Sequence, residues 1–207
     1  MSIPEWANLI WQNIKATTAI EWIAVLLGVA EVLLAKANKI WLYPAGIAAV
    51  LLTAYVLFHS KLYAECLLNG YYLVMSIYGW WFWVKKKNQP PLKITYSNRK
   101  DWWVAIGIIV IGFSILYYAL KYHTDSTVPV WDAWVSATAW AGMWLLAKRK
   151  LENWVLLNIS NIFAIPLLLY KHLPLFAALT LFLFIVAIFG YFDWRKIIRQ
   201  ENSVPTA

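Results

Sequence analysis

Residues 77–83 read Ile-Tyr-Gly-Trp-Trp-Phe-Trp, and residues 188–194 read Ile-Phe-Gly-Tyr-Phe-Asp-Trp. Each stretch follows a long apolar segment, and the isoleucine, the glycine and the last tryptophan of the first return at the same places in the second. Further matches at nearly the same spacing pair Leu33-Leu34-Ala35-Lys36 with Leu145-Leu146-Ala147-Lys148, Trp41 with Trp154, His59 with His172, Leu62 with Leu175 and Ala64 with Ala177. Because the matches run through three apolar segments of each half, the sequence predicts one unit used twice.

The composition is that of a membrane protein. Of 207 residues, 62% are hydrophobic and 14% are charged, and the mean hydropathy is +0.59. A soluble domain carries about 25% charged residues. Fifteen tryptophans suit bilayer interfaces and a ligand cavity. The lone Cys66 argues against a disulfide framework, and we expect no cleavable signal peptide because the start lacks a basic region before an apolar run.

Apolar runs of about twenty residues, the length that crosses a bilayer, define the organisation of the chain. We predict spans at 19–36, 40–58, 63–84, 102–120, 131–147, 152–170 and 174–193. Residues 1–17 have apolar side chains at helical spacing and are predicted to form a helix on the membrane surface. The longest connection, 85–101, contains Pro90 and Pro91 and is linker-like.

The positive charges separate by side of the membrane. Of the eighteen Lys and Arg residues, the connections after spans one, three, five and seven hold fourteen, and the opposite set holds four. By the positive-inside rule the C-terminus is cytoplasmic and the N-terminus is outside. A different number of spans would remove this separation, so the charges also support seven crossings.

The number of crossings sets the orientation of the repeats. Two three-helix units joined directly would lie antiparallel, and one added crossing makes them parallel. We therefore predict an all-α membrane fold of seven helices as 3+1+3 parallel repeats. The expected parts are an interfacial helix (1–17), a first repeat (18–84), a loop with an inverting fourth span (85–130), a second repeat (131–196) and a cytoplasmic tail (197–207). Such halves suit alternating access in a transporter, and a scaffold made by gene duplication is the alternative.

Polar and aromatic side chains share helical faces on three of the spans. Amides and hydroxyls facing lipid are costly, so these side chains should point into the bundle, where they either bond neighbouring helices or line a site. Together they favour a cavity for a flat, polar ring, and the aromatic faces would also suit a cation. The candidate substrate-binding residues are Asn69, Tyr72, Ser76, Trp80, Ser136, Trp140, Trp144, Asn158 and Asn161.

Other conspicuous residues are given structural interpretations. Trp83 and Trp194 fall near the cytoplasmic side and are predicted to be interface anchors, with substrate binding as the alternative. Glu31 lies deeper than the other carboxylates and is expected to pair with Lys36. There is no phosphate loop, nucleophile elbow or metal signature, so we predict neither an enzyme nor a cofactor.

The signature residues resemble a known family. The run from Tyr63-Ala64-Glu65 to Tyr78-Gly79-Trp80-Trp81-Phe82-Trp83, followed by Lys150-Leu151-Glu152-Asn153-Trp154 with Asn158, Asn161 and Pro166, is similar to the PnuC vitamin transporters. The resemblance covers nearly all of residues 20–196.

The resemblance implies a fold like that of sugar exporters, commonly as a homotrimer in the bacterial inner membrane. It also implies uptake of an unphosphorylated vitamin by facilitated diffusion, with a cytoplasmic kinase trapping it. Members carry nicotinamide riboside, thiamine or riboflavin. Many riboside carriers have glutamine where this chain has Asn69. We therefore lean to thiamine, with nicotinamide riboside as the alternative.

Overall fold

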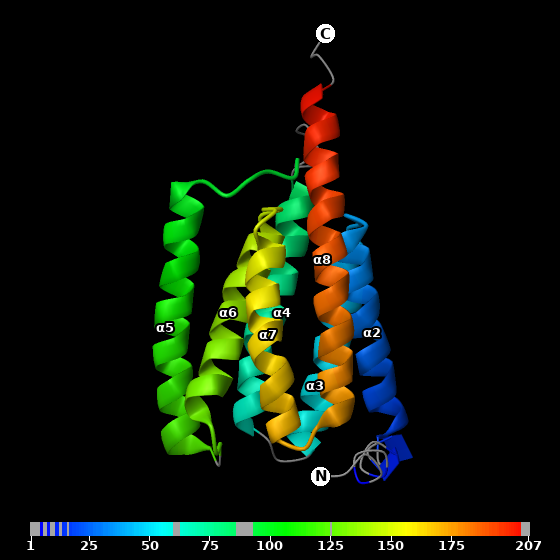
Figure 1. Ribbon diagram of the computed structural model, residues 1–207, viewed down its shortest axis with the longest axis vertical. Coiled ribbons are helices and arrows are strands. Elements are labelled where there is room, and N and C mark those ends of the chain that lie inside the picture. Colours follow the sequence, from blue (N-terminus) through cyan, green and yellow to red (C-terminus); the bar gives the residue numbers. More distant parts are fainter. Residues whose placement is uncertain are drawn as a thin grey trace.

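The protein is a bundle of long helices lying side by side (Figure 1). The computed structural model describes residues 17–59, 63–85, 93–124 and 126–203, and isolated positions before residue 17. These residues form α2 (Ala19–Lys36), α3 (Leu42–His59), α4 (Tyr63–Lys85), α5 (Arg99–His123), α6 (Pro129–Ala147), α7 (Asn153–Tyr170) and α8 (Pro174–Ser203). Six of the predicted spans coincide with helices whose ends differ by three residues or fewer. The predicted surface helix falls largely outside the described residues.

Length and composition mark this as a multi-pass membrane protein. Among the described residues, four helices are by themselves long and apolar enough to cross a bilayer: α3, α5, α7 and residues 176–201 of α8. The other three helices have more polar side chains, including Glu31 on α2, Asn69 on α4 and Asp132 on α6. A helix that packs on several neighbours can carry such groups, because they turn away from lipid.

Six of the helices close into a ring. Neighbours along the ring are α2, α3, α4, α6, α7 and α8, and α8 returns to contact α2. Helix α5 packs on α6 and lies at the edge of the molecule (Figure 1). The ring therefore consists of two consecutive groups, α2–α4 and α6–α8. The two groups meet along two lines, where α4 packs on α6 and where α2 packs on α8. We call these two lines together the seam.

The connection before α5 is fixed to the second group rather than free. Thr95 exchanges backbone hydrogen bonds with the α6–α7 turn, donating to Arg149 and accepting from Leu151 at 3.1 and 3.0 Å. The backbone N–H and the hydroxyl of Ser97 both donate to one carboxylate oxygen of Glu152. The linker-like character expected for 85–101 is thus wrong for its last residues; residues 86–92 lie outside the described part.

Helix α8 extends well past its predicted end at residue 193. The segment predicted as a tail is helical from residue 197 to Ser203. The apolar face of the helix continues beyond the span, because Trp194 and Ile198 are buried in one cluster with Ile94 and Leu151. Since this apolar face is covered by the α4–α5 connection and the α6–α7 turn, the helix persists outside the bilayer.

The two groups repeat their backbone geometry at one constant spacing along the chain. Helices α3 and α7 begin at Leu42 and Asn153, and α4 and α8 begin at Tyr63 and Pro174. The turn after α2 and the turn after α6 each contain one residue with a left-handed backbone, Asn38 (φ 54°) and Arg149 (φ 53°). All three pairs have the same separation in sequence, which we call the backbone spacing.

The backbone spacing corrects one pairing inferred from the sequence. Trp41, matched above to Trp154, is 67% exposed, whereas Trp154 is 1% exposed. The residue that lies one backbone spacing before Trp154 is Tyr43, and the two make equivalent contacts. Tyr43 makes an edge contact with Trp83 (5.1 Å, 86°), and Trp154 makes one with Trp194 (5.6 Å, 86°). Aromatic pairs at these distances favour the edge-to-face arrangement.

The signature glycines allow these aromatic rings to approach the helices. A Cβ on Gly79 would collide with the ring of Tyr43, and a Cβ on Gly190 would lie 2.8 Å from two ring carbons of Trp154. Both positions therefore require glycine for a close approach of a helix to a ring rather than for a turn.

We expect Gly190→Ala to destabilise the fold by about 1–3 kcal/mol, as overpacking of a tight core does. The buried ring of Trp154 has no room to move away from the added methyl group. Denaturant unfolding in detergent micelles would measure the loss. Gly107→Ala is the matched control, since nothing lies within 4 Å of its Cβ. Equal stability of the two variants would contradict the close packing.

Candidate functional site

The last tryptophan of each signature holds the two groups together at one end of the seam. Trp83 Nε1 on α4 donates to the carbonyl oxygen of Ala147 on α6 at 3.1 Å. Trp194 Nε1 on α8 donates to the carbonyl oxygen of Ala35 on α2 at 3.0 Å. Both carbonyls lie in the last turn of a helix, and that of Ala35 also accepts from the backbone N–H of Asn38 at 2.9 Å. We call these two contacts the tryptophan pair.

The tryptophan pair replaces the interface-anchor interpretation of both residues. Trp83 and Trp194 are buried, and each crosses from one group to the other. An indole that anchors a helix at a bilayer interface would face lipid headgroups instead. Together these contacts link both seam lines, so separating the groups at this end requires breaking both.

A cation lies against one half of the tryptophan pair. The guanidinium of Arg149 is 3.8 Å from the ring centroid of Trp83 and donates to Asn38 Oδ1 at 2.8 Å. Asn38 and Arg149 are the left-handed residues of the turns after α2 and α6, so equivalent positions of the two groups touch each other. Burial lowers the pKa of Arg149, and the neighbouring phenol of Tyr43 and carboxylate of Glu201 oppose this effect. Arg149 remains charged at neutral pH, because its ordinary pKa is far above 7.

The expected pair between Glu31 and Lys36 is not formed. Lys36 Nζ instead lies 3.5 Å from Asp193 Oδ2, across the α2–α8 line of the seam. The carboxyl group of Glu31 packs on Gly46 of α3. One turn separates Glu31 from Lys36, but the lysine side chain extends toward the end of the bundle, where the carboxylate of Asp193 is more accessible to solvent.

Farther along the seam, two aromatic rings stack across the α4–α6 line. The rings of Tyr71 and Trp140 are 4.4 Å apart at 22°, and the Tyr71 hydroxyl donates to the carbonyl oxygen of Trp140 at 3.0 Å. Trp140 also packs against Gly112 of α5. Its indole N–H is buried without a hydrogen-bond partner. A buried N–H of this kind is costly unless a ligand accepts its hydrogen bond.

Sequence reasoning predicted Trp140 but missed Tyr71. Tyr71 and Tyr72 are adjacent, and only Tyr72 shares the face of Asn69 and Ser76. The available signal was the second face of α4, on which Tyr71, Met75 and Phe82 recur at helical spacing.

The predicted asparagines of α7 lie next to each other. Asn161 Nδ2 is 3.5 Å from Asn158 Oδ1, and both side chains are partly buried. Between them, the Ser160 hydroxyl donates to the carbonyl oxygen of Val135 on α6 at 2.7 Å. Ser160 therefore holds α7 to α6 beside Ser136, which is partly buried.

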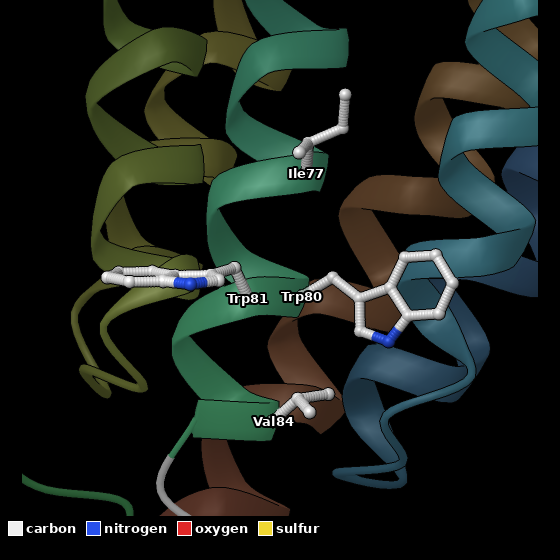
Figure 2. Close-up of a pocket in the computed structure, with 4 residues that line it drawn as sticks. All are labelled: Ile77, Trp80, Trp81 and Val84. Atoms are coloured by element: carbon white, nitrogen blue, oxygen red, sulfur yellow. The ribbon is translucent and has the colours of Figure 1, made fainter.

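The predicted face of α4 divides at Trp80. Ser76 is buried and Asn69 and Tyr72 are partly buried, but Trp80 is 40% exposed. Figure 2 shows Trp80 and Trp81 extending to opposite sides of α4. With Ile77 and Val84 they line an apolar outer groove of about 540 Å³, so Trp80 is not placed with the other candidates.

Trp144 is also separated from the stack. Its ring packs on a cluster of α5, α6 and α7 that includes Ala105, Leu145 and Leu156. The ammonium group of Lys148 lies 5.3 Å from the Trp144 centroid. Trp144 thus fixes α5 to the second group, and the structure does not bring it to Tyr71 or Asn158.

At the end of the second group far from the tryptophan pair, the carboxylate of Asp132 is neutralised by a lysine. Lys171 Nζ lies 2.6 Å from Asp132 Oδ1, and the Ser126 hydroxyl donates to Asp132 Oδ2 at 2.6 Å. A paired carboxylate attracts a cationic solute weakly, because its charge is compensated.

The structure therefore brings two sets of uncharged groups together: Asn158 with Asn161 on α7, and Trp140 with Tyr71 across the α4–α6 line. Groups of these kinds can bind a planar polar ring, the aromatic rings by stacking and the amides by hydrogen bonds. Among the described residues, no group of three His, Cys, Asp or Glu side chains is arranged to hold a metal ion.

Comparison with known proteins agrees with a transport role. Residues 18–196 match a family model described as nicotinamide mononucleotide transporter. The nicotinamide riboside transporter PnuC of Escherichia coli K12 is 23% identical over 210 residues, covering 89% of this chain and 88% of that protein. PnuC of Neisseria mucosa is 26% identical over 195 residues, covering 87% and 73%. A crystal structure of the vitamin B3 transporter PnuC superposes with a TM-score of 0.70 at 22% identity, covering 94% and 88%.

Proposed function

Because the chain belongs to the nicotinamide mononucleotide transporter family, and is therefore a transporter and not an enzyme, we propose that it takes up nicotinamide riboside by facilitated diffusion. The names of the curated relatives support nicotinamide riboside over thiamine. The asparagine at position 69, where many riboside carriers have glutamine, had favoured thiamine. Thiamine remains the second candidate, because it too is a flat cation that suits the aromatic, uncharged groups of the seam.

The observation that carries this proposal is the reciprocal tryptophan pair. Each group donates an indole N–H to the last turn of the first helix of the other. Two equivalent contacts between equivalent groups support the interpretation of the ring as 3+1+3 parallel repeats, with α5 as the inverting linker. Parallel repeats place a substrate between them and move by rocking of one repeat against the other.

The site we propose lies between Trp140, on the α4–α6 line of the seam, and the asparagines of α7. The vitamin ring would stack on Trp140 after displacing or joining Tyr71, and Asn158 and Asn161 would bond its carboxamide. The free indole N–H of Trp140 supplies a further donor. Asn69, Tyr72, Ser76 and Ser136 complete the proposed lining from α4 and α6. The tryptophan pair then closes one end of the seam while the vitamin enters from the other.

The cellular arrangement is part of the same proposal. We place the protein in the bacterial inner membrane with the N-terminus outside and the C-terminus cytoplasmic, as the fourteen-to-four division of basic residues supports. The tryptophan pair then lies at the cytoplasmic end. A cytoplasmic kinase traps the vitamin as its phosphate, and the transporter acts as a homotrimer.

Uptake into liposomes tests the function. Purified protein is reconstituted into vesicles loaded with ATP and either nicotinamide riboside kinase or thiamine kinase, and each vitamin is added outside. We expect nicotinamide mononucleotide to accumulate inside, with no energy source required outside. Accumulation of thiamine phosphate alone would transfer the assignment to thiamine. No phosphorylated product with either kinase would favour a scaffold.

A further inference from the structure

One ionisable group in the ring is not used by the function described so far. Glu31 lies within α2, between the buried Ala24 and Ala35 on the same helical face. Its carboxyl group rests on the backbone of α3 at Gly46, where a Cβ would be 2.9 Å from Oε2 and closer to the other carboxyl atoms. An acidic side chain within a membrane span is expensive, and such groups usually serve a function.

No lysine or arginine in the described part of the chain is paired with this carboxyl group. Among the described residues, the Glu31 side chain has neither an ion pair nor a hydrogen bond. Lys36, on the same helix, contacts Asp193 of α8. Arg149 stacks on Trp83 and bonds Asn38. Tyr43 is the titratable group of α3 that comes near Glu31, and a phenol supplies no positive charge. The carboxyl group of Glu31 is thus left without a counter-charge among the described residues.

In the second group, α6–α8, the equivalent helix contact contains no acidic side chain. At the backbone spacing, Glu31 and Gly46 correspond to Gly142 and Leu157. There the glycine is on the first helix, and a Cβ on Gly142 would be 2.9 Å from the Leu157 side chain. The glycine is thus on the second helix of the pair in the first group and on the first helix in the second group. In the second group the hydrocarbon side chain of Leu157 fills the space between the two helices. Packing alone therefore does not require a carboxyl group at position 31.

Glu31 also lies at the level of the aromatic stack. The turn residues Asn38 and Arg149 touch, so α2 and α6 end at the same level. Glu31 is seven residues before Asn38, and Trp140 is nine residues before Arg149. At 1.5 Å per residue, the carboxyl-bearing residue and the ring differ in depth by about 3 Å.

We propose that Glu31 is the counter-charge for the cationic ring of the vitamin, and that this ring and a proton compete for the same carboxyl group. This inference rests on the proposed function. Before binding, the carboxyl group holds the proton. When the cation arrives, the O–H bond breaks, the proton leaves to water, and the carboxylate pairs with the positive ring. Each cation bound releases one proton, so charge is conserved.

Calorimetric titration with a charged and an uncharged form of one ligand tests this. Nicotinamide riboside carries the cationic ring, and dihydronicotinamide riboside has a neutral ring of nearly the same shape. We expect Glu31→Gln to weaken binding of the cationic form by about tenfold or more, and to leave the neutral form unchanged. In the wild type, affinity for the cation should rise with pH by up to about tenfold per pH unit, and Glu31→Gln should abolish this dependence.

Two further variants keep the test decisive. The double change Glu31→Gly with Gly46→Leu copies the packing of Gly142 and Leu157, so it separates loss of the charge from loss of the fold. Glu21→Gln is the matched control, because Glu21 is an acid of the same helix that caps its start and is partly exposed. Equal affinity of Glu31→Gln and wild type for the cation, or equal weakening of both ligand forms, would overturn the counter-charge. If the wild type binds neither nicotinamide riboside nor thiamine, the proposed function itself fails.

Discussion

Replacing Trp154 by alanine should lower the free energy of unfolding by about 3–5 kcal/mol, the usual cost of removing a large buried aromatic side chain. Trp154 is 1% exposed and lies in the largest buried cluster described, against the edge of Trp194 and on the backbone of Gly190. Removal of the ring would leave a cavity beside the tryptophan pair. Denaturant unfolding followed by tryptophan fluorescence in detergent micelles measures the change.

Trp41→Ala is the matched control for this prediction. Trp41 is the residue that sequence matching pairs with Trp154, but it is 67% exposed. An exposed substitution away from special contacts changes stability by about 0.5 kcal/mol or less. Similar losses for both variants would mean that the two tryptophans are equivalent, and the correspondence of Trp154 with Tyr43 would be wrong.

The helices could be predicted because a bilayer limits what an apolar run can do. Backbone groups in lipid must be bonded within the segment, so runs of about twenty apolar residues become helices. The predicted end of α8 was wrong for the same reason. Beyond the bilayer, helix length depends on partners such as Ile94 and Leu151, which come from other parts of the chain.

The repeat could be detected, but its register could not be read from residue identity. Leu33-Leu34-Ala35-Lys36 and its copy are separated by one residue more than the backbone spacing, at which the turns that follow them repeat. The two groups of helices have contacts at the same positions, but different residues make these contacts in each group. Tyr43 and Trp154 fill the same place with different rings, and the acid at Glu31 stands where Gly142 stands in the copy.

The candidate site was predicted in part, since helical periodicity indicates a shared face but not its direction. Asn158 and Asn161 are neighbours as expected. Trp80 and Trp144 share helices with the stacked pair of Tyr71 and Trp140 but face other surroundings. Tyr71 was missed because its partner, Trp140, is 69 residues away, and nothing in local sequence shows which helix lies opposite.

Replacing Trp140 or Asn158 by alanine should weaken binding of nicotinamide riboside by about tenfold or more. Stacking of a cationic ring on an indole contributes about 0.5–2 kcal/mol, and an amide left unmatched costs a further 1–3 kcal/mol. A tenfold loss corresponds to about 1.4 kcal/mol, which lies within the range expected for either change. Calorimetric titration of the purified protein gives the dissociation constants directly.

Two comparisons separate a binding role from a packing role for these residues. Trp80→Ala removes a predicted site residue that the structure places in the outer groove, so its affinity should stay within about twofold of wild type, or about 0.4 kcal/mol. Trp140→Phe keeps an aromatic face and loses the free indole N–H, so its affinity should fall between those of wild type and alanine. If Trp80→Ala weakened binding while Trp140→Ala and Asn158→Ala did not, the vitamin would bind on the outer surface of α4. The seam would then serve only to hold the two groups of helices together.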